Sequence, residues 1–353
     1  MDAMSAPPWQ RPTVAALADL AQRGVHAALV HGQAGTGKLL AAIAFARFLL
    51  CERPSALQAC GTCTGCRLVQ AANHPDLRIV VPDALAELVP MPSRPDDDMP
   101  AAEGAGEAGD GKSKRSREIR IEQVRQLGDL AEMSSHQSGR RVVVMAPAEA
   151  LNAAAANAAL KLLEEPPPRM MFVLCADALD DVLPTIRSRC VLVRAGRPTA
   201  AAALSWLQEQ GVDDAEVRLA EAGGAPLAAM DQAGRASLDP ESRNALMGML
   251  RAGSQLSLAR IVADVPRAVA VGPACAMMQR WAWDILALQH GAPVRYHPAE
   301  RPILERLASM PADGWLHWWK ELGGMRSSAD HPLNPRLVVE AALIGYARAA
   351  SGA

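Results

Sequence analysis

His31-Gly32-Gln33-Ala34-Gly35-Thr36-Gly37-Lys38-Leu39 is the most informative segment of this chain. Residues 32–38 match the first seven positions of the phosphate-loop pattern G-x-x-x-x-G-K-[ST]. In such a loop the glycines let backbone N–H groups turn towards phosphate oxygens, and the lysine reaches the β and γ phosphates. We therefore expect Gly32, Gly35, Gly37 and Lys38 to form a phosphate loop. The alternative is a plain glycine-rich turn between a strand and a helix.

The residues on both sides of the loop fit the same pattern. Residues 27–30 form a short apolar run suited to a buried strand, and residues 39–50 have the apolar character of a packed helix. The eighth position of the pattern is Leu39, where a hydroxyl is needed to hold Mg²⁺. The loop is therefore degenerate, and ATP binding is doubtful.

A phosphate-loop ATPase also needs a second acidic site at the end of a buried strand, where one carboxylate helps to hold Mg²⁺ and another polarises water. Residues 142–145 are suited to that strand, but Ala146 and Pro147 follow it. Glu149 comes two residues later, where it would sit differently. Catalytic magnesium is thus unsupported at two independent places, and we expect no ATP hydrolysis by the isolated chain.

Four of the seven cysteines lie close together with the spacing C-x₈-C-x₂-C-x₂-C: Cys51, Cys60, Cys63 and Cys66. Zinc prefers four tetrahedral ligands, and thiolates suit it. Because protein ligands would fill all four positions, the spacing predicts a structural Zn²⁺ site. The alternatives are disulfides or unreactive thiols. The other cysteines, Cys175, Cys190 and Cys275, stand alone in apolar surroundings and are expected in the core.

Apolar runs alternate with helical patterns through the first part of the chain. Strands are expected at residues 27–30, 77–81, 141–145, 170–175 and 191–193. This alternation predicts an α/β fold in which helices cover both faces of a parallel sheet. After Pro198 the pattern is helical as far as the end of the chain.

Changes in composition divide the chain into three expected domains. Residues 1–195 would form a nucleotide-binding-like domain with the zinc module at 51–66. An insert at about 90–116 is rich in Pro, Gly, Ala and acidic residues, so we expect it to be disordered. Residues 196–238 and 239–353 would form two helical domains.

Composition narrows the class of protein. The chain has 353 residues, half of them hydrophobic, and a net charge of −2 from 36 basic and 38 acidic residues. This balance argues against a protein whose whole surface binds nucleic acid, although it allows a local basic patch. The basic segment 112–120 is interpreted as a solvated loop end, with a nucleic-acid contact as the alternative. No secretory signal or apolar run of membrane-spanning length is present, so a cytoplasmic location is expected.

Two segments resemble the bacterial clamp-loader AAA+ family. The first contains Lys161-Leu162-Leu163-Glu164-Glu165-Pro166-Pro167, and the second is Leu183-Pro184-Thr185-Ile186-Arg187-Ser188-Arg189-Cys190, which is similar to the family's Ser-Arg-Cys motif. The four-cysteine insert after the phosphate-loop helix is also similar. The resemblance covers nearly all of residues 9–197 and, weakly, the helical remainder. It implies a RecA-like AAA+ sheet, followed by a small helical lid and an all-α collar domain.

Within that family, active motor subunits keep a Ser or Thr after the lysine and an Asp-Glu pair on the second strand, and this chain keeps neither. Its sensor positions, in 175–177 and 223–226, also lack the usual Thr/Asn and Arg. A chain that combines this degraded ATP machinery with an intact Ser188-Arg189-Cys190 resembles a non-catalytic subunit of the family. The resemblance implies that Arg189, with Ser188, acts in trans as an arginine finger on a neighbour's ATP. The alternative role for Arg189 is a surface salt bridge.

The resemblance also implies partners. These are the gamma/tau ATPase subunits and a delta subunit of a hetero-pentamer, with the sliding clamp and primer–template DNA reached through the complex. Two other classes remain open. One is a divergent active ATPase, a gamma/tau-like motor subunit that uses Glu149, and the other is a zinc-dependent DNA-binding protein.

Overall fold

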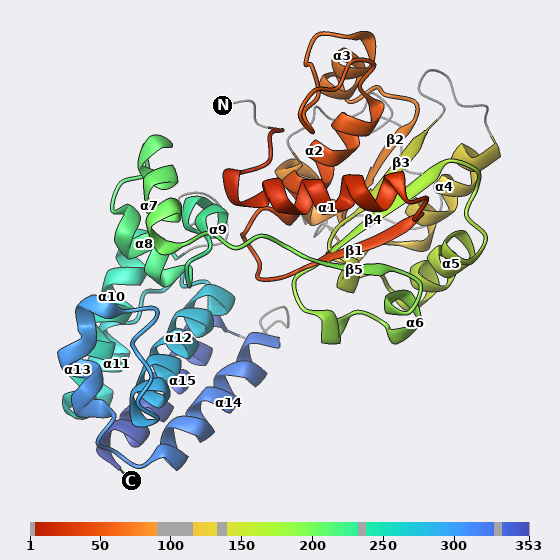
Figure 1. Cartoon of the computed structure of the whole chain (residues 1–353). Coiled ribbons are helices and arrows are strands. Elements are labelled where there is room, and N and C mark those ends of the chain that lie inside the picture. Colours follow the sequence, from red (N-terminus) through yellow and green to blue (C-terminus); the bar gives the residue numbers. More distant parts are fainter. Residues whose placement is uncertain (1–3, 90–115, 133–139, 232–237, 328–333, 353) are drawn as a thin grey trace. The chain divides into compact units, whose positions relative to one another are not determined.

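The computed structural model describes residues 4–89, 116–132, 140–231, 238–327 and 334–352 (Figure 1). The chain divides into two compact units, Met1–Arg197 and Pro198–Ala353. The insert expected at about 90–116 lies outside the described residues, except for its last position, Ser116.

The first unit contains a five-stranded sheet in the order β2-β3-β4-β1-β5. All four neighbouring pairs are parallel. The strands are β1 Ala27–His31, β2 Leu77–Val80, β3 Arg141–Met145, β4 Met170–Ala176 and β5 Val191–Arg194. Every expected strand is present with bounds that differ by at most one residue, so the predicted α/β fold with a parallel sheet is confirmed.

Helices cover both faces of this sheet. They are α1 Arg11–Gln22, α2 Lys38–Leu50, α3 Thr64–Gln70, α4 Ile121–Glu132, α5 Ala153–Glu164 and α6 Pro184–Arg187. Ala28 and Val30 of β1 belong to the core formed with α1 and α2, whereas Ala27 and Leu29 belong to the core formed with α4 and α5. Alternate residues of a strand point to opposite faces, so a central strand buried on both sides has to be apolar throughout.

Helix α5 shows how the local sequence sets its bounds. The Asn152 side chain caps the helix by accepting a hydrogen bond from the backbone N–H of Ala155 at 2.9 Å. An alanine-rich stretch follows, with Ala155, Ala156 and Ala159 packed against the sheet. The helix ends at Glu164, two residues before the first of three consecutive prolines. Glu164 is therefore placed at the carboxyl end of α5.

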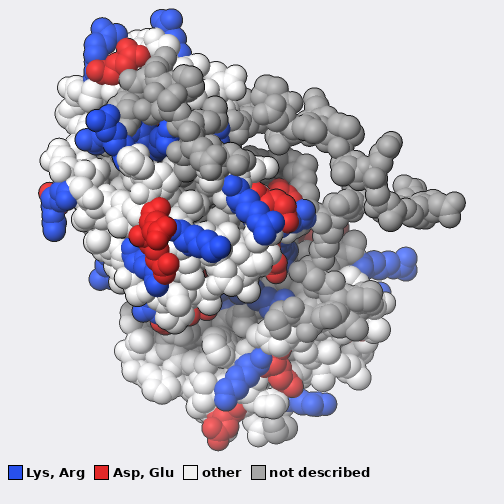
Figure 2. All heavy atoms as spheres, turned by 90° about the vertical axis from the view of Figure 1, so that its right-hand side faces the viewer, with Lys and Arg blue, Asp and Glu red and all other residues white. Residues whose placement is uncertain are grey.

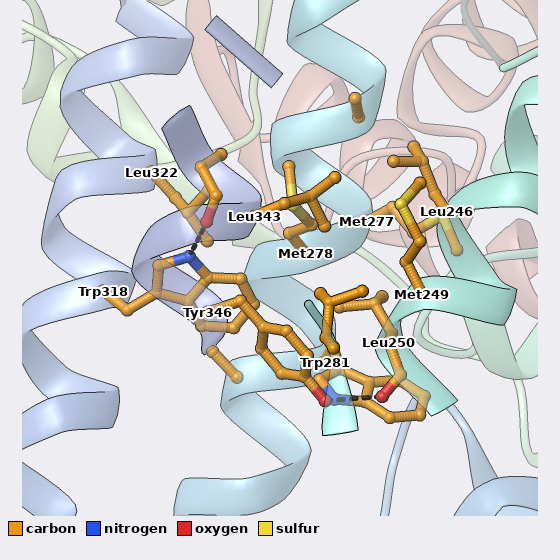
Figure 3. Packing of buried hydrophobic residues seen from close by; sticks show 14 of the residues in the cluster. Leu246, Met249, Leu250, Met277, Met278, Trp281, Trp318, Leu322, Leu343 and Tyr346 are labelled. Atoms are coloured by element: carbon orange, nitrogen blue, oxygen red, sulfur yellow. Dashed lines mark hydrogen bonds between the residues drawn. The ribbon is translucent and has the colours of Figure 1, made fainter. Parts of the chain in front are cut away.

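The second unit is entirely helical in its described residues, as predicted. Its helices are α7 Ala200–Glu209, α8 Ala215–Glu221, α9 Pro226–Asp231, α10 Pro240–Ala252, α11 Leu258–Asp264, α12 Val271–Gln289, α13 Arg301–Leu307, α14 Ala312–Ser327 and α15 Pro335–Ser351. Its core is built around fully buried aromatic side chains from α12, α14 and α15 (Figure 3). Trp318 donates to the backbone oxygen of Ala342 at 2.7 Å, and the Tyr346 hydroxyl donates to that of Leu250. Each buried polar atom of these two side chains therefore has a partner, which offsets its loss of water.

The segments on either side of residue 238 contact each other within this unit. Arg243 of α10 forms an ion pair with Glu221 of α8, and Arg295 donates to the backbone oxygen of Gly223 at 3.0 Å. The clustering of contacts places both segments in one compact unit. The division into domains 196–238 and 239–353 therefore stays a prediction.

Candidate functional site

The parallel pairing of β1 and β4 decides what lies beside the phosphate loop. His31 is in register with Ala176, and the N–H of Gly32 donates to the oxygen of Ala176 at 3.2 Å. Asp177 directly follows this position, so its side chain enters the space next to the loop. The carboxyl ends of adjacent parallel strands are where such folds place ligand-binding groups.

The Lys38 ammonium group is engaged within the chain. It donates to the backbone oxygens of Gly32 at 2.7 Å and Gln33 at 2.9 Å, and it pairs with Asp177 Oδ1 at 2.5 Å. An ammonium group has three donors, so these contacts use all of them. Lys38 is only 6% exposed. The structure therefore brings together the predicted Gly32 and Lys38, but in a closed arrangement.

Residues from the N-terminal end of the chain fix the outer side of the loop. The Trp9 indole and the Gln10 amide both donate to the backbone oxygen of Thr36, at 2.7 and 2.8 Å. The Gln10 amide also donates to the oxygen of Gly196 at 2.9 Å. Gln10 is fully buried. One side chain thus joins the loop to the last residues of the first unit.

No catalytic carboxylate pair stands at the end of β3. Ala146 and Pro147 occupy the positions after the strand, as the sequence indicates. Glu149 uses one carboxylate oxygen to accept the backbone N–H of Asp177 at 2.8 Å. Leu39 is partly buried against the core of α1 and α2 and offers no oxygen ligand. Glu149 therefore fixes the backbone of Asp177, and Leu39 cannot hold a magnesium ion.

The four clustered cysteines converge on one point. Their sulfur atoms all lie within 4.8 Å of one another, with Cys51 and Cys63 at 3.9 Å and Cys60 and Cys66 at 4.0 Å. All four are free thiols, and these separations are far longer than a disulfide bond of about 2.05 Å. A tetrahedral ion with bonds of about 2.3 Å places its sulfur ligands about 3.8 Å apart. The four thiols therefore fit a single metal ion.

Backbone N–H groups surround these sulfurs. Those of Cys60, Cys63 and Cys66 donate to the preceding sulfur of the cluster, at 3.2, 3.4 and 3.4 Å. Donation from the amides of Thr62 and Cys63 lowers the pKa of the Cys60 thiol to about 5. Burial raises the pKa of Cys66 to about 12. A bound cation would favour the thiolate at both positions, since metal binding displaces thiol protons.

The short helix α3, which we did not predict, belongs to this cluster. The Cys63 sulfur caps it by accepting the N–H of Cys66. Gly65 lies so close to the end of α2 that a Cβ atom there would stand 2.5 Å from the backbone oxygen of Leu50. The glycine therefore lets the cysteine segment pack directly on the helix that follows the phosphate loop.

Arg189 lies on the turn between α6 and β5, with its side chain 34% exposed. It forms an ion pair with Glu164, and it donates to the backbone oxygen of Thr185 at 2.9 Å and to the Ser188 hydroxyl at 3.4 Å. Ser188 in turn donates to Thr185 at 3.0 Å. The Ser188 hydroxyl therefore contributes to the geometry of the turn that presents Arg189.

Buried and exposed apolar residues alternate around this turn. Cys190 is buried, and burial raises the pKa of its thiol to about 12, so it acts as an apolar anchor. In contrast, Leu183, Val191 and Leu192 are between 42% and 46% exposed. β5 is an edge strand of the sheet. Arg189 thus lies between apolar side chains that face solvent in the single chain.

A family model described as DNA polymerase III, delta subunit, matches residues 10–198, which is more than half of the chain. The chain belongs to this family. This finding confirms the resemblance drawn from the two segments around Glu164 and Arg189.

Curated relatives agree with this family. The DNA polymerase III subunit delta' of Pseudomonas aeruginosa is 36% identical over 226 residues, 63% of this chain and 60% of that protein. That of Escherichia coli is 32% identical over 205 residues, 58% of this chain and 52% of that protein. The matches thus span between about half and three fifths of these relatives. A gamma subunit-related protein of Thermotoga maritima has a TM-score of 0.47 and 17% identity, covering 97% of this chain and 99% of that one.

The sequence analysis missed three contacts of the candidate site. It noted Asp177 as a lost sensor residue but did not pair it with Lys38, and it did not pair Arg189 with Glu164. It also missed Gln10 as a loop anchor. The position of Asp177 after a strand paired with β1 carried a usable signal, whereas the other two contacts join segments whose packing the sequence pattern does not specify.

Proposed function

We propose that this chain is a non-catalytic, delta-prime-type subunit of a replicative clamp loader, which helps to load the sliding clamp onto primed DNA. In this proposal it supplies Arg189, supported by Ser188, to the ATP site of a neighbouring gamma/tau ATPase subunit. The complex would be a cytoplasmic hetero-pentamer that also contains a delta subunit. Residues 196–238 would be the lid, and residues 239–353 would be the collar that joins the ring.

One contrast within the first unit carries the proposal. The chain's own phosphate loop is closed because Lys38 is used internally, and neither Leu39 nor Ala146 can ligate magnesium. Arg189, however, is partly exposed on a surface turn. A chain that lacks a working site but presents an arginine is suited to assist another chain's site. The contact between Glu149 and Asp177 argues against the alternative of a divergent motor subunit that uses Glu149.

The chemistry of the guanidinium group fits this role. Arginine stays charged at all relevant pH values and offers a planar fork of donors that matches phosphate oxygens. Charge builds on the γ-phosphoryl oxygens during transfer, and an arginine supplied in trans stabilises it. The contacts of Arg189 with Thr185 and Ser188 restrict the orientation of the guanidinium group before a neighbour binds.

The surface around Arg189 supports a protein partner. Leu183, Val191 and Leu192 are all more than 40% exposed and flank Arg189 in the sequence. Exposed apolar side chains on and beside an edge strand are typical of surfaces that another chain covers. A neighbouring subunit seated on this edge would bury them and bring its nucleotide to Arg189.

Zinc is the metal that we propose for Cys51, Cys60, Cys63 and Cys66. Four thiolates at these separations suit tetrahedral Zn²⁺ and leave no open coordination position. Its role would be structural, holding the segment 51–66 against α2. The same cluster does not favour a zinc-dependent DNA-binding protein, since no aromatic residue lies within 51–66 for stacking on bases.

DNA would be reached through the complex. On the face shown in Figure 2, the described Lys and Arg side chains lie in several separate groups, some of them beside Asp and Glu. Among the described residues, no helix has the length and apolar character needed to cross a membrane.

Purification of the untagged chain from its own cells tests the proposal. Recovery of ATPase subunits and a delta subunit in stoichiometric amounts is the expected result. The isolated chain should release no phosphate from ATP above the background of a Lys38→Ala variant. ATP hydrolysis that depends on Lys38, or a chain that is recovered alone, would contradict the assignment.

A further inference from the structure

We propose that Asp177 is an internal anion that takes the place of a nucleotide phosphate at Lys38 and thereby excludes polyphosphates from the loop. The question arises because residues 32–38 keep the glycines and the lysine of a phosphate loop. Leu39 stands where the pattern has a Ser or Thr hydroxyl, so a magnesium ligand is missing. The anion-binding part of the pattern is still in place. The missing magnesium ligand therefore does not explain why the Lys38 ammonium group is bonded within the chain.

The donors of Lys38 provide the first argument. Gly32, Gln33 and Asp177 accept its three ammonium protons at 2.7, 2.9 and 2.5 Å. Of these three acceptors, only the Asp177 carboxylate is charged, as a phosphate oxygen would be. A charge-assisted hydrogen bond is roughly twice as strong as a neutral one. An incoming phosphate therefore has to displace the strongest of the three contacts.

Local charge provides the second argument. Asp177 is 47% exposed although Lys38 is 6% exposed, so the carboxylate lies on the solvent side of the ammonium group. Glu149 contacts the backbone of Asp177 and adds a second carboxylate. A polyphosphate approaching Lys38 would meet the Asp177 carboxylate first, with the Glu149 carboxylate close behind it, and like charges in a partly desolvated site repel strongly. Asp177 is thus a counter-ion of Lys38 within the chain, and its negative charge repels an incoming phosphate.

The backbone keeps this counter-ion in place. Asp177 follows the last residue of β4, and the pairing of Ala176 with His31 fixes its distance from the loop. The bond from its N–H to Glu149 holds its backbone from the other side. The backbone of Asp177 is therefore held from two sides, which keeps its carboxylate within reach of Lys38.

An Asp177→Asn variant of the full-length chain tests the inference, because it removes the charge and keeps the shape. The probes are ADP and inorganic pyrophosphate, measured by titration calorimetry with and without Mg²⁺. The wild-type chain should show no saturable binding at millimolar ligand. The variant should bind both ligands with a gain in affinity of about tenfold or more. Because Leu39 gives magnesium no ligand, the gain should be the same without Mg²⁺.

Two further variants make the result specific. Lys38→Ala combined with Asp177→Asn should abolish the gain, since it removes the cation that the ligand uses. Asp180→Asn is the matched control: it removes a carboxylate three residues away that pairs with Arg187 at 3.7 Å, and it should leave binding unchanged. Asp177→Ala provides a second removal of the same carboxylate. Thermal melting confirms that each variant is folded.

Equal affinity of the wild-type chain and Asp177→Asn for ADP would overturn the inference, and so would folded Asp177 variants that bind neither ligand. The measurements use the isolated chain. A failure here would therefore leave the role of Arg189 in a ring intact, and a failure to recover a ring would leave this result standing.

Discussion

Arg189 forms an ion pair with Glu164, the last residue of α5. Both side chains are partly exposed, at 34% and 48%, so water screens the pair. Exposed pairs of this kind contribute about 0–1 kcal/mol to stability. The carboxylate also lies at the negative end of the helix dipole, where it is less favourable. The pair therefore orients Arg189 in the single chain without making it essential to the fold.

Arg189→Ala and Glu164→Ala should each lower the free energy of unfolding by less than about 1 kcal/mol. Chemical denaturation followed by circular dichroism measures this. A loss of about 3 kcal/mol or more would show that the pair is a structural element, since losses of that size follow from breaking buried pairs.

The chain should purify with about one zinc ion when chelators are omitted, because its four thiols fit a closed tetrahedral site. Elemental analysis checks this. Cys63→Ser should lose the metal and loosen the segment 51–66, since binding energy is also folding energy. Cys275→Ala is the control, a change at a buried cysteine in the second unit, and this variant should keep the zinc ion. Metal-free protein with intact thiols would contradict the assignment.

Gly196→Ala should unfold or strongly destabilise the first unit. A Cβ atom there would stand 1.8 Å from the backbone oxygen of Trp9, and backbone cannot move aside cheaply. The change would also disturb the bonds of Gly196 to Gln10 and Thr13. Gly128→Ala in α4 is the control, because a Cβ there has open space, and it should stabilise the helix by about 0.5–1 kcal/mol. Equal melting temperatures for the two variants would contradict the close contact at residue 196.

The sequence predicted most of the fold because its signals were periodic and local. The five strands lie within one residue of their expected bounds, since apolar runs such as 170–175 are bounded by prolines and polar turns. Helix α3 was missed because the cysteine segment has no helical periodicity, and its cap is a sulfur atom.

The site was predicted less completely, for a different physical reason. The sequence identified Lys38, Arg189 and the four cysteines by their patterns. It did not identify Asp177 as the partner of Lys38 or Glu164 as the partner of Arg189. These pairs join residues that are 139 and 25 positions apart in the sequence. Such pairs depend on strand order and on helix ends, which a motif does not encode.

Tyr346→Phe should destabilise the second unit by about 1 kcal/mol, because it removes the hydrogen bond to Leu250 and keeps the ring (Figure 3). Trp318→Ala should cost about 3–5 kcal/mol, because it leaves a cavity among α12, α14 and α15. Thermal melting of both variants shows which of the two changes destabilises the second unit more. A smaller effect for Trp318→Ala than for Tyr346→Phe would contradict the packing of this core.

In the proposed function, Arg189 serves a neighbour's ATP site. An arginine finger is worth on the order of 10³–10⁵ in rate at a single site, but only one site of several would lose it here. Arg189→Ala should therefore lower total ATPase activity only in part, while Arg189→Lys should recover little because lysine lacks the bidentate fork. Arg187→Ala is the matched control, with a side chain 35% exposed and paired with Asp180.

The most direct measurement is the DNA- and clamp-stimulated ATPase rate of the reconstituted complex, together with clamp loading. With Arg189→Ala the complex should assemble normally, and both rates should fall, whereas Arg187→Ala should leave both unchanged. A complex that contains Arg189→Ala, yet hydrolyses ATP and loads clamps at the unmutated rate, would contradict the account.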